Sequence, residues 1–406
     1  MLLGLDVENF RSLRRVSLPL GPLNVLVGPN GAGKTNVLDV FRFLSDVIRT
    51  DLEPALELRG GFPQVVFRGG YRTGRESDRH RGVDLNKPAS FVRIKLTATW
   101  TTYSSPNAPD EYALRIGRTG RAGLTRAESF AFKRTQGRGR RITIQGQKVS
   151  VVDTGAGSGE REFGIRRLSS GLSTLPRLTD EQGGTEVATM AERLASFRVF
   201  DVSVDAARRP SRFPRSAESL EDDAANLAAF LLMLRTRDEP AWARLVTDAC
   251  DVLPQLDDID FDYPSGPARE VVVVLRERGM RAPTQLADAS FGTIRLLGLL
   301  ALLYDPQPPA LTCVEEIDHG LHPQALELLV ERLRDASART QFLIATHSPA
   351  LADRLKPEEI IVCERRDDGA SVIPAVSREQ VRRIVAESEG LPLGDLWFSG
   401  ALGGDL

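Results

Sequence analysis

Eight residues near the start of the chain have the types and spacing of a phosphate-binding loop. They are, in order, Gly28, Pro29, Asn30, Gly31, Ala32, Gly33, Lys34 and Thr35, which match the pattern G-x-x-x-x-G-K-[S/T]. Glycines let the backbone curl so that successive N–H groups point at phosphate oxygens, and a following helix adds its positive end. Lys34 is expected to contact the β- and γ-phosphates, and Thr35 to offer a hydroxyl to Mg²⁺. Together with Asn36, which comes next, these residues predict a site for ATP and Mg²⁺.

A pair of carboxylates could supply the acidic partner that a phosphate-binding loop needs. Glu315 and Glu316 directly follow the apolar residues 311–314, which read as a buried strand. Two adjacent carboxylates repel each other unless a cation lies beside them. We therefore expect Glu315 to bind Mg²⁺ and Glu316 to polarise the attacking water. The alternative is a pair of solvated glutamates at a strand end.

A third polar group follows another apolar run, residues 341–345. It is Thr-His-Ser, and its His347 is expected to reach the γ-phosphate as a catalytic residue. Of the four histidines in the chain, three (His319, His322 and His347) lie in the short stretch after the two glutamates. A single histidine is more often a structural residue, but this clustering favours a functional one.

The elements that must position these residues can be read from the hydrophobic pattern. Residues 2–8 and 13–19 alternate as strands do, 23–27 form a buried strand, and 36–48 have helical spacing. Residues 68–90 and 153–184 are predicted loops, and 91–152 a meander of antiparallel strands. Helical patterns at 186–195 and 220–235 and a strand at 271–278 follow. From residue 290 onward helices and strands alternate.

These patterns predict an α/β fold whose nucleotide-binding domain is discontinuous. Residues 1–66 and 285–406 would form the two halves of a P-loop domain. Between them we expect an inserted arm or lid, made of an Arg/Gly-rich and β-rich part at 67–184 and a helical or mixed part at 185–284.

Several of these segments resemble a known group of ATPases. The residues Val-Glu-Asn-Phe-Arg-Ser-Leu at 7–13, the P-loop string at 23–39, Gly-Leu-His-Pro at 320–323 and the tail at 393–400 carry the likeness. Together with the Glu-Glu and Thr-His-Ser strands, they are similar to the heads of ABC-class ATPases. The likeness is closest to RecF/SMC-like and OLD-like ATPases that stand alone without a Toprim domain. It covers residues 1–66 and about 285–400.

The resemblance implies a signature loop that acts across a homodimer. Ser290 and Gly292 occupy its positions, and in such heads they bind the γ-phosphate held by the partner chain. Ala289 departs from the leucine that the family usually has there. The alternative is that Ser290 is a helix N-cap.

Three more assignments follow from the resemblance. Residues 317–322 would be the D-loop. Gln64 would be the glutamine that senses Mg²⁺ and the attacking water, and Arg11 would contact the nucleotide.

An arginine-rich stretch at 111–141 is the candidate contact with DNA or RNA. It contains nine basic residues and two glutamates, in a chain whose formal net charge is −2. Such a local surplus of cations could grip phosphates, although a solvated surface is the alternative reading.

The function that these features predict is an ATP hydrolase that acts as a dimerisation switch. The resemblance suggests DNA repair or anti-phage defence, beside a nuclease or another effector protein. An intrinsic nuclease of OLD type is disfavoured because the Toprim pattern is absent after His347, and a subunit of an ABC transporter because the P-loop and Glu316 lie so far apart. A protein that holds ATP without turnover would not need Glu316. With no long apolar run and no paired cysteine motif, we expect a cytoplasmic protein without membrane contact.

Overall fold

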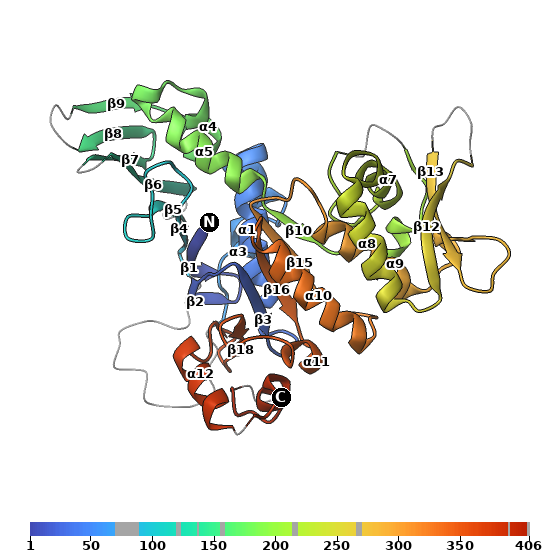
Figure 1. Cartoon of the computed structure of the whole chain (residues 1–406). Coiled ribbons are helices and arrows are strands. Elements are labelled where there is room, and N and C mark those ends of the chain that lie inside the picture. Colours follow the sequence, from blue (N-terminus) through green and yellow to red (C-terminus); the bar gives the residue numbers. More distant parts are fainter. Residues whose placement is uncertain are drawn as a thin grey trace.

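The computed structural model describes residues 1–69, 89–118, 123–135, 138–154, 159–212, 218–264, 270–388 and 390–403. Within these residues no helix is long and apolar enough to cross a membrane. Two large sheets organise the molecule, one antiparallel and one parallel (Figure 1).

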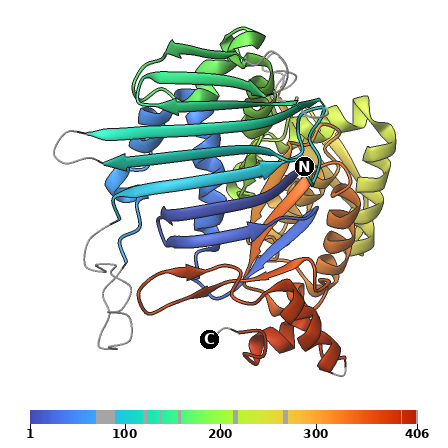
Figure 2. The ribbon, with the colours of Figure 1, turned by 90° about the vertical axis from the view of Figure 1, so that its left-hand side faces the viewer.

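The antiparallel sheet contains the predicted meander. Its order is β2 (Leu13–Pro19), β1 (Leu2–Phe10), β4 (Phe91–Ala98), β5 (Asp110–Arg118), β6 (Leu124–Thr135), β7 (Arg138–Gln145), β8 (Lys148–Thr154) and β9 (Glu160–Gly164). The N-terminal strand β1 pairs along β4, with Val7 opposite Ile94. The meander is thus a continuation of the sheet that the N-terminal strands begin (Figure 2). Most of the predicted loop at 68–90 lies outside the described residues.

The parallel sheet brings the two ends of the chain together. Its order is β10 (Arg198–Phe200), β15 (Leu311–Glu315), β16 (Gln341–Thr346), β3 (Leu23–Val27) and β17 (Ile360–Val362). The strand before the P-loop, β3, lies between two strands from the C-terminal part, which confirms the predicted discontinuous α/β fold. Strand β10 comes from the middle of the chain and pairs with β15. It was not predicted, because three residues are too few for a recognisable pattern.

Each face of the parallel sheet is covered by its own core, since successive strand residues point to opposite faces. One core joins Leu26, Cys313 and Leu343 to helix α1 (Lys34–Thr50), helix α5 (Gly184–Ala195) and the inner face of the antiparallel sheet. The other joins Val25 and Ile344 to the helices of the opposite face. These are α7 (Leu227–Arg237), α8 (Glu239–Val252), α9 (Phe291–Leu303) and α10 (Pro323–Ala336).

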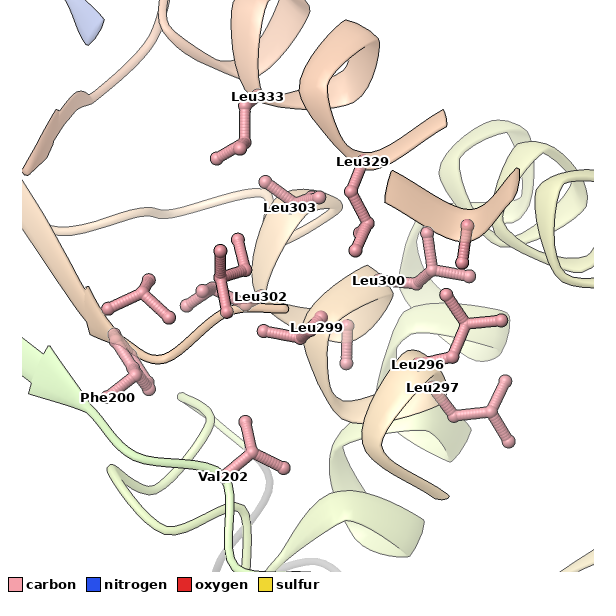
Figure 3. Packing of buried hydrophobic residues seen from close by; sticks show 14 of the residues in the cluster. Phe200, Val202, Leu296, Leu297, Leu299, Leu300, Leu302, Leu303, Leu329 and Leu333 are labelled. Atoms are coloured by element: carbon pink, nitrogen blue, oxygen red, sulfur yellow. The ribbon is translucent and has the colours of Figure 1, made fainter. Parts of the chain in front are cut away.

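Helix α9 is apolar all round because it is enclosed on every side. Its leucines pack against α10, against Phe200 at the end of β10 and against Val202 just after this strand (Figure 3). The predicted helix at 220–235 begins only at Leu227. Asn226 accepts a hydrogen bond from the backbone N–H of Glu221 and donates one to the Ser219 carbonyl, which holds the preceding residues in a turn.

The remaining elements are short. A smaller sheet contains β11 (Ser211–Arg212), β13 (Glu270–Glu277), β12 (Leu256–Asp262) and β14 (Thr284–Gln285), and a hairpin contains β18 (Glu364–Arg365) and β19 (Ser371–Val372). The other α-helices are α2 (Leu52–Glu57), α3 (Phe62–Val65), α4 (Gly171–Thr174), α6 (Val204–Ala207), α11 (Pro349–Ala352), α12 (Arg378–Glu387) and α13 (Leu393–Phe398). Single 3₁₀ turns span Leu175–Arg177, Asp180–Gln182 and Leu286–Asp288.

Candidate functional site

Three parallel strands end side by side at the edge where the predicted site residues lie. Val27 of β3 is opposite Thr346 of β16, and Ala345 of β16 is opposite Glu315 of β15. The P-loop, His347 and Glu316 therefore leave the sheet at the same edge, as ligand-binding residues of open α/β sheets do.

Lys34 lies at the centre of the P-loop. Its Nζ donates to the carbonyl oxygens of Gly28, at 2.5 Å, and Pro29, at 3.0 Å. Burial lowers the pKa of Lys34, while the nearby carboxylates of Glu316 and Asp318 act in the opposite direction. Both carboxylates come from the C-terminal part of the chain, and Glu316 is one of the two glutamates predicted to lie beside the P-loop.

Two glycines of the P-loop are required by close contacts. A Cβ at Gly28 would lie 2.3 Å from the carbonyl oxygen of Cys363. Gly33 has a φ of +102°, and a Cβ there would lie 2.1 Å from the hydroxyl oxygen of Ser371. The C-terminal part of the chain thus packs directly against the loop, and only glycine fits at these positions.

Thr35 and Glu315 meet although they are 280 positions apart. The Thr35 hydroxyl donates to Oε2 of Glu315 at 3.3 Å, and Arg42 of α1 forms an ion pair with Oε1 at 3.1 Å. A hydroxyl and a carboxylate are oxygen donors of the kind that Mg²⁺ binds beside a nucleotide. The residues present therefore fit the predicted metal site.

Glu316 has an exposed side chain on an unusual backbone conformation. Its φ is +47°, in the left-handed region that costs a non-glycine residue about 1–2 kcal/mol. Its N–H donates to the carbonyl of Ala345, and its own carbonyl accepts from Nη2 of Arg295 at 2.7 Å. Arg295 is only 3% exposed and also donates to the Val202 carbonyl. Helix α9 therefore holds the backbone that aims the Glu316 carboxylate.

The end of β16 is fixed by a second polar contact. Thr346 is buried and donates to Oδ1 of Asp318 at 2.5 Å, and it accepts from the N–H of Ser348. His347 between them is exposed. The imidazole is thus accessible at the same edge as Glu316.

The signature-loop residues start α9. Ser290 is the N-cap, and its hydroxyl accepts from the N–H of Thr293 at 3.2 Å, so the capping alternative is correct for the isolated chain. A Cβ at Gly292 would lie 2.8 Å from the carbonyl of Gly320, and the ring of Phe291 lies 5.4 Å from that of His319. The loop packs on the predicted D-loop. Among the described residues, neither Ser290 nor Gly292 has a polar contact with the P-loop.

Arg11 and Gln64, which were assigned from the resemblance alone, lie near Asn36 at the start of α1. Arg11 forms an ion pair with Asp39 at 3.1 Å, and Asn36 donates to the Ser12 hydroxyl. Gln64 is on α3, and it lines the same cavity as Arg11 and Asn36. The structure brings Gln64 into no hydrogen bond with Thr35 or Glu315, the predicted metal ligands.

The arginine-rich stretch is less cationic than its composition suggests. Arg140 is buried against Asp153 and Glu186, and Arg134 forms ion pairs with Asp180 and Glu186. Arg126 is buried beside Glu128. Arg121 lies outside the described residues. These internal pairs remove three of the nine cations that the sequence offered for phosphate binding.

Sequence reasoning missed the groups that support the site. Arg42, Arg295 and Asp318 contact or flank Glu315 and Glu316, yet each is an ordinary polar residue in its own segment. The one signal was Arg295, a single charge inside an otherwise apolar helix. Such a charge is retained only where it has buried partners.

The fold and this edge define a P-loop ATPase head of the ABC-like class. A family model described as "AAA domain, putative AbiEii toxin, Type IV TA system" matches residues 23–143 and 158–353, well over half of the chain. The protein belongs to this family. The SMC head bound to the C-terminal winged-helix domain of ScpA has a similar fold, with a TM-score of 0.54, 14% identity, and coverage of 92% of this chain and 96% of that one.

Two curated relatives match a short part of the chain. An OLD nuclease of Thermus scotoductus is 41% identical over 85 residues, which is 18% of this chain and 16% of that protein. The replication and repair protein RecF of Brucella abortus is 35% identical over 75 residues, or 16% of this chain and 20% of RecF. The chain is therefore an ATPase head of the RecF/SMC/OLD type that matches a fifth or less of each curated relative.

Proposed function

We propose that the protein hydrolyses ATP with Mg²⁺ and uses the cycle as a dimerisation switch. Thr35 and Glu315 would hold the ion, which neutralises phosphate charge when it is bound. Lys34 would bind the β- and γ-phosphates, Glu316 would orient and deprotonate the attacking water, and His347 would contact the γ-phosphate. The observation that carries the proposal is the meeting of Lys34, Thr35 and the two glutamates at one sheet edge.

A dimer is proposed because the signature-loop residues of a chain do not reach the P-loop of the same chain. Ser290 and Gly292 carry donors suited to a γ-phosphate, but they pack on the D-loop rather than on their own P-loop. A second chain in an ATP sandwich would present them to the opposite site. Binding of ATP would close the pair, and hydrolysis would open it.

Complementation between two inactive variants tests the trans arrangement. Lys34→Ala should lose nucleotide binding, and Ser290→Arg should bind ATP but not hydrolyse it. A mixture of the two should recover activity, because one of its two shared sites has an intact P-loop and an intact signature loop. Full activity of Ser290→Arg alone, or no recovery in the mixture, would contradict the proposal.

A variant of the base gives an independent check on the switch. Glu316→Gln keeps the shape of the side chain but cannot accept the water proton, so it should bind ATP and stop turnover. Light scattering after gel filtration should then find a dimer with ATP and a monomer with ADP. If this variant hydrolyses ATP normally, Glu316 is not the base.

The proposal includes a DNA-related role, supported by the outer face of the antiparallel sheet. Arg93 of β4 and Arg115 of β5 are directly opposite each other, a like-charge pair that an anion would stabilise, and Glu8 of β1 lies opposite Arg93 on its other side. Neither forms an ion pair with a described residue, although Arg115 lies over the ring of Phe91 at 4.4 Å. Both line a groove of about 460 Å³, and Glu8, Ala113, Ala127 and Ser129 are among its other lining residues. A phosphate backbone would fit this groove better than the internally paired arginines of the 111–141 stretch.

Fluorescence anisotropy with labelled DNA and RNA tests this surface. Replacing both Arg93 and Arg115 by Ala should weaken binding and reduce the salt dependence by about two phosphate contacts. The control is Lys95→Ala, on the same face but paired with Glu111 at 3.2 Å. If the double arginine variant and Lys95→Ala lose the same affinity for nucleic acid, or if the double variant loses none, the groove is not the binding surface. That result would leave the proposal of a protein effector partner unaffected.

A further inference from the structure

A cationic cavity of about 240 Å³ lies beside the P-loop. Its described lining includes Arg11, Asn36, Gln64, Arg68 and Arg365, and it contains no carboxylate. Arg11 is neutralised by an aspartate outside the lining, whereas Arg68 and Arg365 form no ion pair with any described residue. The cavity is smaller than the roughly 300–1,000 Å³ of a complete small-molecule site. The cavity is therefore large enough for one end of a ligand, and that end must be compatible with the positive charge of the arginines.

The C-terminal hairpin forms one wall of this cavity. Arg365 on β18 donates through Nη1 to the carbonyl of Gly31, at the tip of the P-loop, at 2.9 Å. On β19, Ser371 shares a hydrogen bond of 2.7 Å with Ser12, whose hydroxyl also accepts from Asn36. These contacts join the hairpin to the P-loop and to the first turn of α1. The guanidinium of Arg365 is exposed and uses one of its five donors in this contact.

We infer that the cavity receives the nucleoside end of the bound nucleotide, and that Arg365 contacts it. The inference rests on the proposed function. Asn36 directly follows Thr35 and opens into the cavity, so a phosphate chain held by Lys34 and Thr35 ends next to it. Guanidinium planes stack on purine rings, and the side-chain amide of Gln64, which has no hydrogen bond to a described residue, can pair with a base edge.

This placement gives Gln64 a role different from the sensing of Mg²⁺. It also assigns to the C-terminal hairpin a direct part in nucleotide binding. The hairpin would then contact the nucleoside, while the P-loop binds the phosphates.

Calorimetric titration with two ligands tests the inference. Arg365→Ala should weaken ATP binding about tenfold and leave the affinity for inorganic tripolyphosphate unchanged, because the latter has no nucleoside. Arg366→Ala is the matched control, since this neighbouring residue is exposed and its side chain has no ion pair or hydrogen bond with a described residue. Lys34→Ala should weaken both ligands.

Each other outcome has a defined meaning. Equal weakening of ATP and tripolyphosphate in Arg365→Ala would overturn the inference, because Arg365 would then only support the shape of the P-loop. Unchanged ATP binding would overturn it as well. If the wild-type protein binds neither ligand, the proposed function fails and the inference fails with it. Circular dichroism of each variant verifies that it is folded.

Discussion

Replacement of Arg295 by Ala should separate ATP hydrolysis from ATP binding. The guanidinium is buried and donates to the carbonyls of Val202, at 2.9 Å, and Glu316, at 2.7 Å. A longer bond of 3.4 Å to the Glu315 carbonyl comes from the same Nη2 as the bond to Glu316 and is counted with it. Hydrogen bonds from charged donors contribute about 1.5–3 kcal/mol each, so two lost bonds correspond to roughly 3–6 kcal/mol. Burial also lowers the pKa of Arg295, which means that part of this gain offsets the cost of desolvating the charge. We expect a net loss of about 3 kcal/mol in the free energy of unfolding.

The effect on catalysis follows from the backbone of Glu316. Its left-handed conformation is held partly by Arg295, and a carboxylate that is displaced by about 1 Å can slow a reaction up to a hundredfold. We therefore expect kcat to fall about 10- to 100-fold, and each factor of ten corresponds to about 1.4 kcal/mol of activation free energy. The Kd for ATP should change less than about twofold. Urea unfolding, calorimetry and a phosphate-release assay measure the three quantities.

Arg339 provides the control for this prediction. It also donates to two carbonyls, those of Leu303 and Asp305, but it is exposed and lies beyond the other end of α9. Arg339→Ala should cost less stability and leave kcat unchanged. If Arg295→Ala hydrolyses ATP at the wild-type rate, or if Arg339→Ala slows it equally, the link from α9 to Glu316 is refuted.

Two further predictions concern the P-loop and the smaller sheet. Gly33→Ala should abolish ATP binding measured by calorimetry, because its Cβ would lie 2.1 Å from a serine hydroxyl; wild-type affinity would show that the loop tolerates a side chain. Hydrogen bonds from Arg276 and Arg235 hold the pKa of Asp260 well below its usual range. The stability from this pairing is therefore present above pH about 4 and is lost as the pH falls through the folded-state value. Asp260→Asn should cost about 1 kcal/mol at pH 7, a small value because the arginines are about half exposed, and clearly less near pH 2, where part of this stability is already lost. A loss that is the same at both pH values would contradict this origin.

The parts of the site that the sequence predicted are those with a local pattern. The P-loop has a fixed spacing of glycines and Lys34, and Glu315 and Glu316 directly follow an apolar strand, so each could be recognised without knowledge of its partners. The same holds for β3 and α1, whose hydrophobic periods are regular. We expected Thr35 and Glu315 to lie near each other because both were predicted to bind the same Mg²⁺ ion. The register of β3, β16 and β15 brings the two side chains together.

The parts that were not predicted depend on contacts between distant segments. The positive charge of Arg134 and Arg140 is cancelled by Asp153, Asp180 and Glu186, which composition within 111–141 could not include. The role of Arg365 depends on a hairpin folding back over 334 positions onto Gly31. No periodicity within either segment encodes such pairings, because they are set by tertiary packing.

We propose that Thr35 and Glu315 hold one magnesium ion beside ATP. The affinity of the protein for Mg²⁺ in the presence of ATP should then depend on both side chains. Wild type, Thr35→Ala, Glu315→Gln and the double variant would be titrated with Mg²⁺ at saturating ATP, with the free ion followed by an indicator dye. We expect about tenfold weaker Mg²⁺ binding in each single variant and little further loss in the double variant, since both side chains serve one ion. Wild-type Mg²⁺ affinity in Glu315→Gln would contradict it.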